Sequence, residues 1–171
     1  MKKGGVGGGN TITGLAFEGK CDMRTALAAN PRVAIVGDDV FVDGERRGTL
    51  YQKRKLYTNL LTPKGVDYRT ILSKQLLPDD AIISHSSNVL TIVEKKFQCV
   101  AGSVDEKLQT CDFKNKQYHK LLAPLAVQVQ YVYVLNDWFR HSSYKDVLEY
   151  IESVGCSYFF NELPLEFLKL D

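Results

Sequence analysis

Two acidic residues and a lysine have the types and spacing that could carry chemistry. Asp79 directly follows Pro78, and Glu94 opens the run Glu94-Lys95-Lys96. Magnesium is a hard cation that prefers oxygen ligands, and it usually takes one or two protein carboxylates while it keeps several waters. We therefore expect Asp79 and Glu94 to bind Mg²⁺ together, as the phosphodiester chemistry of a metal-bound water would require.

A predicted hairpin has to bring the two acids together. Residues 80–84 and 89–99 are predicted to be strands, and a polar turn lies between them at residues 85–88. A turn centred near Ser86 and Ser87 brings residue 79 or residue 80 opposite Glu94. This reasoning leaves Asp79 and Asp80 as alternatives for the metal ligand.

Side-chain alternation along the second strand places its polar residues on two faces. Glu94, Lys96 and Gln98 share one face, and the side chain of Lys95 points away from it. The Lys96 ammonium could hold the attacking water and offset the charge that develops on a phosphate. Gln98 could hydrogen-bond the water or the phosphate, and the backbone carbonyl of Lys95 could add a metal ligand.

The two segments resemble the PD-(D/E)xK nucleases, in particular the type II restriction endonucleases. The resemblance rests on Pro78-Asp79-Asp80-Ala81-Ile82-Ile83 followed by Ile92-Val93-Glu94-Lys95-Lys96-Phe97-Gln98, and it covers roughly residues 11–137. It implies a restriction-endonuclease-like core and a Mg²⁺ cofactor, for which Mn²⁺ can substitute. It also implies that Asp79 and Glu94 bind the metal, that Lys96 orients the nucleophile, and that Glu18 on an N-terminal helix supports the metal site.

The implied activity is hydrolysis of phosphodiester bonds in double-stranded DNA by a sequence-specific endonuclease. A homodimer is the economical expectation, because two symmetric sites can cut the two antiparallel strands. A homing, repair or junction-resolving nuclease with the same site is one alternative. A non-catalytic DNA-binding domain with a structural acidic cluster is another, and magnesium dependence separates it from the enzymes.

Two further segments are candidates for contacts with DNA. The run Lys53-Arg54-Lys55 lies between Tyr51 and Tyr57, either as a phosphate-binding patch or as the wet face of a helix. Ser103 and Lys107 lie at the start of a predicted helix whose free amides would favour a phosphate, although capping alone also explains Ser103.

The remaining patterns predict one α/β domain over residues 11–171, with a mixed central β-sheet flanked by α-helices, after a flexible glycine-rich arm at residues 1–10. Helices are expected at residues 14–29, 50–61, 68–75, 113–122 and 144–154 and after Gly102, and further strands at 32–42, 127–135 and 157–160.

Composition agrees with a single globular domain. The 171 residues are 44% hydrophobic and 25% charged, and no apolar run approaches the length of roughly 20 residues that a bilayer requires. Glycines follow the two N-terminal lysines where a secretory signal would be apolar. We therefore expect a cytoplasmic protein with reduced cysteines, and a net charge of +2 is too small to identify its partner.

Overall fold

A seven-stranded mixed sheet forms the centre of the fold. The computed structural model describes residues 14–17, 22–100 and 104–170. The strands lie in the order β2-β3-β4-β5-β6-β7-β8, with the bounds Val33–Val36, Asp39–Val42, Glu45–Leu50, Asp80–Ser84, Val89–Lys96, Gln128–Leu135 and Ser157–Phe160. Neighbours from β2 to β6 are antiparallel, whereas β6, β7 and β8 run parallel. The predicted α/β class with a mixed central sheet is confirmed.

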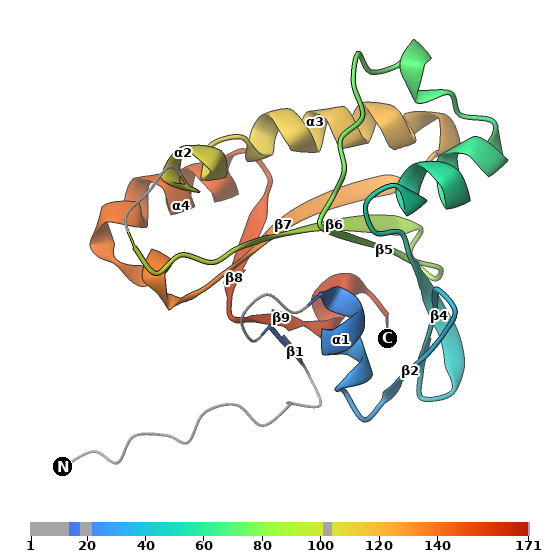
Figure 1. Ribbon diagram of the computed structural model, residues 1–171, viewed down its shortest axis with the longest axis horizontal. Helices are drawn as coiled ribbons and strands as arrows, with labels where there is room; N and C mark the ends of the chain where they lie inside the picture. The colour runs from blue at the N-terminus through green and yellow to red at the C-terminus, as the bar shows by residue number, and fades with distance from the viewer. Residues whose placement is uncertain (1–13, 18–21, 101–103, 171) are drawn as a thin grey trace.

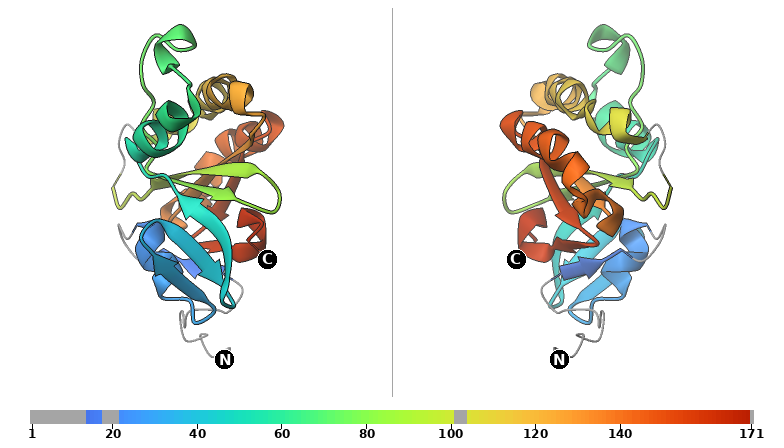
Figure 2. Two further views of the ribbon diagram at one scale, coloured as in Figure 1. Left: turned by 90° about the vertical axis from the view of Figure 1, so that its right-hand side faces the viewer. Right: turned by 90° about the vertical axis from the view of Figure 1, so that its left-hand side faces the viewer.

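Helices cover both faces of the sheet. The helices α2 (Val104–Leu108), α3 (Cys111–Leu122) and α4 (Lys145–Ser153) lie over one face, and α1 (Met23–Ala28) lies on the other (Figure 1 and Figure 2). A parallel connection needs a long crossover, and α2 and α3 form it between β6 and β7. The C-terminal segment, with β9 (Glu162–Pro164), lies on the α1 side.

Alternating side chains of β6 feed two separate cores. Leu90 and Ile92 are fully buried in the core under α3 and α4, whereas Val93 is buried in the core that contains the residues of α1. Because alternation continues along a strand, Glu94 and Lys96 belong to the α3 side of the sheet. The side chain of Lys95 belongs to the α1 side.

The predicted helix at residues 14–29 is wrong over its first part. Gly14–Ala16 is instead the strand β1, which pairs with β9, and the helix begins only after Asp22. Leu15 and Phe17 are buried while Ala16 is half-buried, which is the period of a strand. Asp22 caps the helix by accepting from the Thr25 N–H at 2.8 Å.

Three other predicted boundaries also need correction. Leu50 belongs to β4, because pairing with β5 extends this strand to the first residue of the segment predicted as helical. A π-helix covers only Leu56–Leu61. The helix at 68–75 is a single 3₁₀ turn, Tyr68–Thr70. The second hairpin strand ends at Lys96, since the Gln98 N–H donates to the Asn136 side chain at 3.1 Å instead of to a strand.

Several simpler expectations can also be compared with the structure. The predicted strands at 80–84 and 157–160 have the observed bounds, and those at 32–42 and 127–135 agree to within a residue or two apart from the internal turn. Cys99, Cys111 and Cys156 are free thiols. Over the described residues, no helix is long and apolar enough to cross a membrane. Residues 1–10 lie outside the described residues.

Candidate active site

The open end of the β5–β6 hairpin brings the predicted acids together. Asp80 pairs with Val93 at the end of the ladder, and continuing this register places Asp79 opposite Glu94. The Lys95 N–H fixes the position of Asp79 by donating to its Oδ2 at 3.1 Å. The hairpin therefore has the geometry that the turn at Ser86 and Ser87 predicts.

Asp80 and Asp79 have different environments although they are neighbours. Asp80 is fully buried and accepts from the Met23 N–H at 3.2 Å and from the Gln52 amide, and its Oδ2 lies 2.8 Å from the Lys95 ammonium. The side chain of Asp79 is 40% exposed and borders a cavity. Asp80 thus joins α1, the segment after β4, and β6, whereas Asp79 is the aspartate that a ligand can reach.

Glu94 is a nearly buried carboxylate held by two lysines. Its side chain is 6% exposed, and its Oε2 lies 3.1 Å from Lys96 Nζ and 3.4 Å from Nζ of Lys114 on α3. Burial, and to a smaller extent the nearby charge of Glu94, raises the pKa of Tyr118 and of Tyr131. These phenols are therefore neutral, and the lysines supply the positive charge that balances Glu94.

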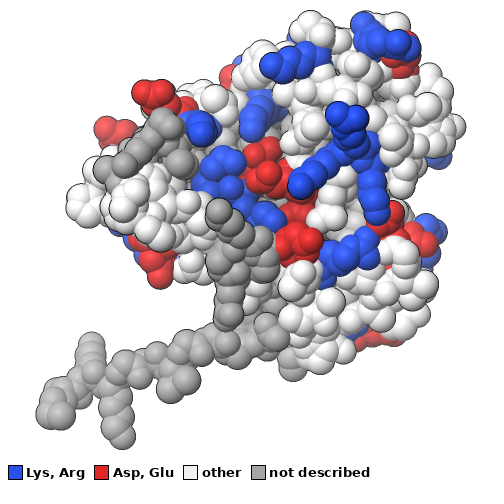
Figure 3. Space-filling view, in the orientation of Figure 1, with Lys and Arg blue, Asp and Glu red and all other residues white. Residues whose placement is uncertain are grey.

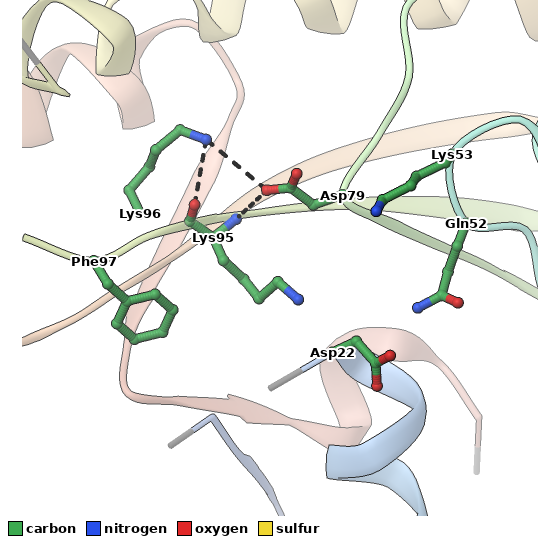
Figure 4. A pocket seen from close by; sticks show the side chains of 7 residues that line it. All are labelled: Asp22, Gln52, Lys53, Asp79, Lys95, Lys96 and Phe97. Atoms are coloured by element: carbon green, nitrogen blue, oxygen red, sulfur yellow. Dashed lines mark hydrogen bonds and ion pairs between the residues drawn. The ribbon is translucent and has the colours of Figure 1, made fainter. Parts of the chain in front are cut away.

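Three oxygens converge on the ammonium of Lys96. Nζ lies 3.1 Å from Glu94 Oε2. It also lies 3.3 Å from the Lys95 carbonyl oxygen and 3.9 Å from Asp79 Oδ2 (Figure 4). These are the three groups that the sequence predicts as metal ligands. A cation, here an ammonium, thus lies among the oxygen donors that a hard metal ion would use.

The cavity beside these groups has a volume of about 560 Å³ and combines side chains from both sides of the sheet edge. It is lined by Asp22, Gln52, Lys53, Asp79, Lys95, Lys96 and Phe97 (Figure 4). On the surface, acidic side chains lie near the middle of this face with basic side chains on either side of them (Figure 3). The basic side chains beside the acidic ones would favour the approach of a polyanion.

Sequence reasoning missed Asp22 and Gln52. Asp22 lines the cavity as the N-cap of α1, and the hydrogen bond from the Thr25 backbone lowers its pKa. The Asp22 side chain three residues before Thr25 is a usable capping signal, but the prediction placed the helix start at residue 14. Nothing local marks Gln52, whose partner Asp80 lies 28 residues further along the chain.

The other predicted site residues lie in varied positions. Gln98 lies beyond β6, where it is buried and its amide donates to the Val100 carbonyl oxygen at 2.6 Å, so it does not line the cavity. The side chain of Lys107 is exposed on α2. Glu18 and Ser103 lie outside the described residues.

The three basic residues of the predicted patch, Lys53, Arg54 and Lys55, lie in different surroundings. Lys53 lines the cavity, and Arg54 is exposed outside it. Lys55 is held by Asp38, at 2.7 and 2.9 Å from its two oxygens. They do not form one helical face, because a turn occupies 53–54.

The residues present fit a magnesium ion by the chemistry of their donors. Asp79, Glu94 and the Lys95 carbonyl offer hard oxygens, and two carboxylates are as many as Mg²⁺ usually takes from a protein. In the part of the chain that the structure describes, no three His, Cys, Asp or Glu side chains gather as a metal site. A metal bound here would keep water ligands and would require the Lys96 ammonium to move.

Comparison with known proteins finds no match for this chain. No protein-family model, no curated protein and no solved structure matches the chain.

Proposed function

We propose that the chain is a magnesium-dependent endonuclease that hydrolyses phosphodiester bonds in double-stranded DNA, in the manner of a type II restriction endonuclease. The observation that carries the proposal is the convergence of Asp79, Glu94 and the Lys95 carbonyl on one cationic group beside an open cavity. Two carboxylates and a lysine at the end of a hairpin are what the resemblance to PD-(D/E)xK nucleases requires.

In this proposal Asp79, Glu94 and the carbonyl of Lys95 would hold the metal. Bound magnesium would neutralise the scissile phosphate and make a water acidic enough to attack. Lys96 would then leave the carboxylates, hydrogen-bond the attacking water and balance the charge that grows on the phosphate. Lys114 stays within 3.4 Å of Glu94 and fixes its orientation.

The arrangement of elements supports the proposal further. The antiparallel hairpin β5–β6 carries the acids, α3 follows, and β7 returns parallel to β6. This order of strands, helix and parallel strand is the one that a restriction-endonuclease-like core would have. Two protomers related by a twofold axis would offer one site to each DNA strand.

Incubation with plasmid DNA and Mg²⁺, followed by sequencing of the product ends, tests the proposal. We expect wild type to cut, Asp79→Asn to lose cutting, and Asp67→Asn to retain it. Asp67 is a matched control because it is an exposed aspartate, paired with Arg69, away from the cavity. Absence of cleavage with every divalent metal would exclude the catalytic function.

The same experiment separates the alternatives within the proposal. Unique product ends indicate a restriction or homing enzyme, and random ends indicate a general nuclease. Product ends at the branch points of branched DNA indicate a junction-resolving enzyme. Cutting lost in Asp80→Asn but kept in Asp79→Asn would reverse the assignment of the metal ligand.

A second candidate function is a non-catalytic DNA-binding domain. The observation in its favour is that Lys96 and Lys114 already balance Glu94, so that the cluster is electrostatically complete with lysines alone. Such a domain would bind DNA equally well with and without magnesium, and Lys96→Ala would leave that binding and the fold intact.

A further inference from the structure

Hydrogen bonds hold the segment that carries Lys53 next to the acidic residues. The Tyr51 N–H donates to the Ala81 carbonyl oxygen at 2.7 Å, and the Lys53 N–H donates to the Pro78 carbonyl oxygen at 3.1 Å. The side chain of Gln52 between them binds buried Asp80. The backbone of Lys53 is therefore held beside the peptide that precedes Asp79. The side chain of Lys53 thus starts from a fixed position next to the acidic residues.

The backbone conformation of Lys53 is one that glycine adopts more readily. Its φ is +50°, in the left-handed region. Non-glycine residues in this region concentrate at ligand-binding and catalytic sites, where the surrounding structure maintains them. A lysine here supplies a long cationic side chain at a position where its backbone alone would favour glycine.

The cations of the cavity differ in what they contact. Lys95 lies 2.8 Å from Asp80 and Lys96 lies 3.1 Å from Glu94, whereas Lys53 forms no ion pair with any residue that the structure describes. In Figure 4 the side chain of Lys53 extends into the cavity toward Asp79. Lys53 is an exposed residue, and its ammonium remains available to a ligand.

We propose that Lys53 binds a backbone phosphate of the DNA next to the phosphate that is cut. This inference rests on the proposed function. Asp22 and Asp79 line the same cavity and repel a polyanion, so a cation without an internal partner is needed on the approach. An ammonium serves as a mobile point charge for a phosphate and carries no base specificity.

Binding of a short fluorescein-labelled DNA duplex, measured by anisotropy in Ca²⁺, tests the role of Lys53 without requiring cleavage. Loss of one phosphate contact should weaken binding about eightfold in about 0.1 M salt and reduce the slope of log K against log salt by about 0.9. We expect both effects in Lys53→Gly. Lys53→Arg should keep binding close to wild type.

The variant Lys53→Gly also controls for folding, because glycine suits the backbone at this position. Its thermal midpoint should equal or exceed that of wild type. Lys64→Gln is the matched control for charge, since it removes one positive charge from an exposed lysine that does not line the cavity. We expect this control to bind DNA within about twofold of wild type, as for a residue that makes no phosphate contact.

The outcomes distinguish the inference from the function on which it rests. Equal weakening by Lys53→Gly and Lys64→Gln would overturn the inference, because it would mean a general effect of net charge. Wild type that cuts plasmid DNA while Lys53→Gly binds as tightly as wild type would overturn the inference alone. Wild type that neither binds nor cuts DNA would overturn both.

Discussion

Replacing Lys96 by methionine should raise metal affinity while abolishing cleavage. Methionine keeps most of the aliphatic stem and removes the ammonium that lies 3.1 Å from Glu94 and 3.9 Å from Asp79. In wild type a metal has to displace this ammonium before it can reach the same oxygens. The variant removes the competitor, and it also removes the group proposed to hold the water.

The distances set the size of the expected change. At an effective dielectric constant of about 20, two unit charges 3.1 Å apart attract by about 5 kcal/mol, but desolvation offsets most of this. A hydrogen bond to a charged group contributes about 1.5–3 kcal/mol net. The lower figure corresponds to roughly tenfold in an equilibrium constant, so we expect Mn²⁺ or Mg²⁺ to bind Lys96→Met about tenfold more tightly.

Isothermal titration of the metal, at one pH for both proteins, measures this change. Lys64→Met is the control, because Lys64 is an exposed lysine outside the cavity. Cleavage of plasmid DNA should fall by about a hundredfold or more in Lys96→Met. Equal or weaker metal binding by Lys96→Met would refute the reasoning that the ammonium and the metal share one site.

Other predictions concern the residues that hold the site together. In chemical denaturation, Asp80→Asn should lower the free energy of unfolding by about 3 kcal/mol, because the Asp80 carboxylate is fully buried among three donors. Asp79→Asn should leave the free energy of unfolding within about 0.5 kcal/mol of the wild-type value. Asp22→Ala should cost about 1 kcal/mol near neutral pH through the lost cap. Because the Asp22 pKa lies below its ordinary value of 3.8 in the folded protein, the cap stabilises above that pH, and the difference from wild type should close as the pH falls through the lowered pKa. Gly48→Ala should destabilise by about 2 kcal/mol, since a Cβ there would lie 2.6 Å from the Ile83 carbonyl oxygen; an unchanged thermal midpoint would contradict this.

The part of the site that the sequence predicts is the part that lies within one hairpin. The strand at 80–84 and the turn after it fix the pairing, so the approach of residue 79 to Glu94 follows from a short stretch of chain. The sequence left Asp79 and Asp80 as alternatives, because their difference is one of burial. That difference depends on α1, which comes from far away in the chain.

The parts that the sequence did not predict depend on long-range contacts. The N–H of Met23 reaches Asp80 across 57 residues, and no local pattern encodes such a contact. In the segment from Gly14, a leucine and a phenylalanine lie two residues apart, as in a strand. The methionine and Leu27 that follow fit the spacing of a helix, so the pattern is compatible with a strand and with a helix. Pairing with β9, near the C-terminus, decides in favour of a strand.

The bond from the Met23 N–H to Asp80 has a consequence for amide hydrogen exchange. The first N–H groups of a helix lack intrahelical acceptors and ordinarily exchange quickly. Here the first residue of a six-residue helix donates to a fully buried carboxylate. Its amide should therefore exchange far more slowly than its position in the helix suggests. The exchange rate of this single amide reports whether the walls of the cavity stay assembled.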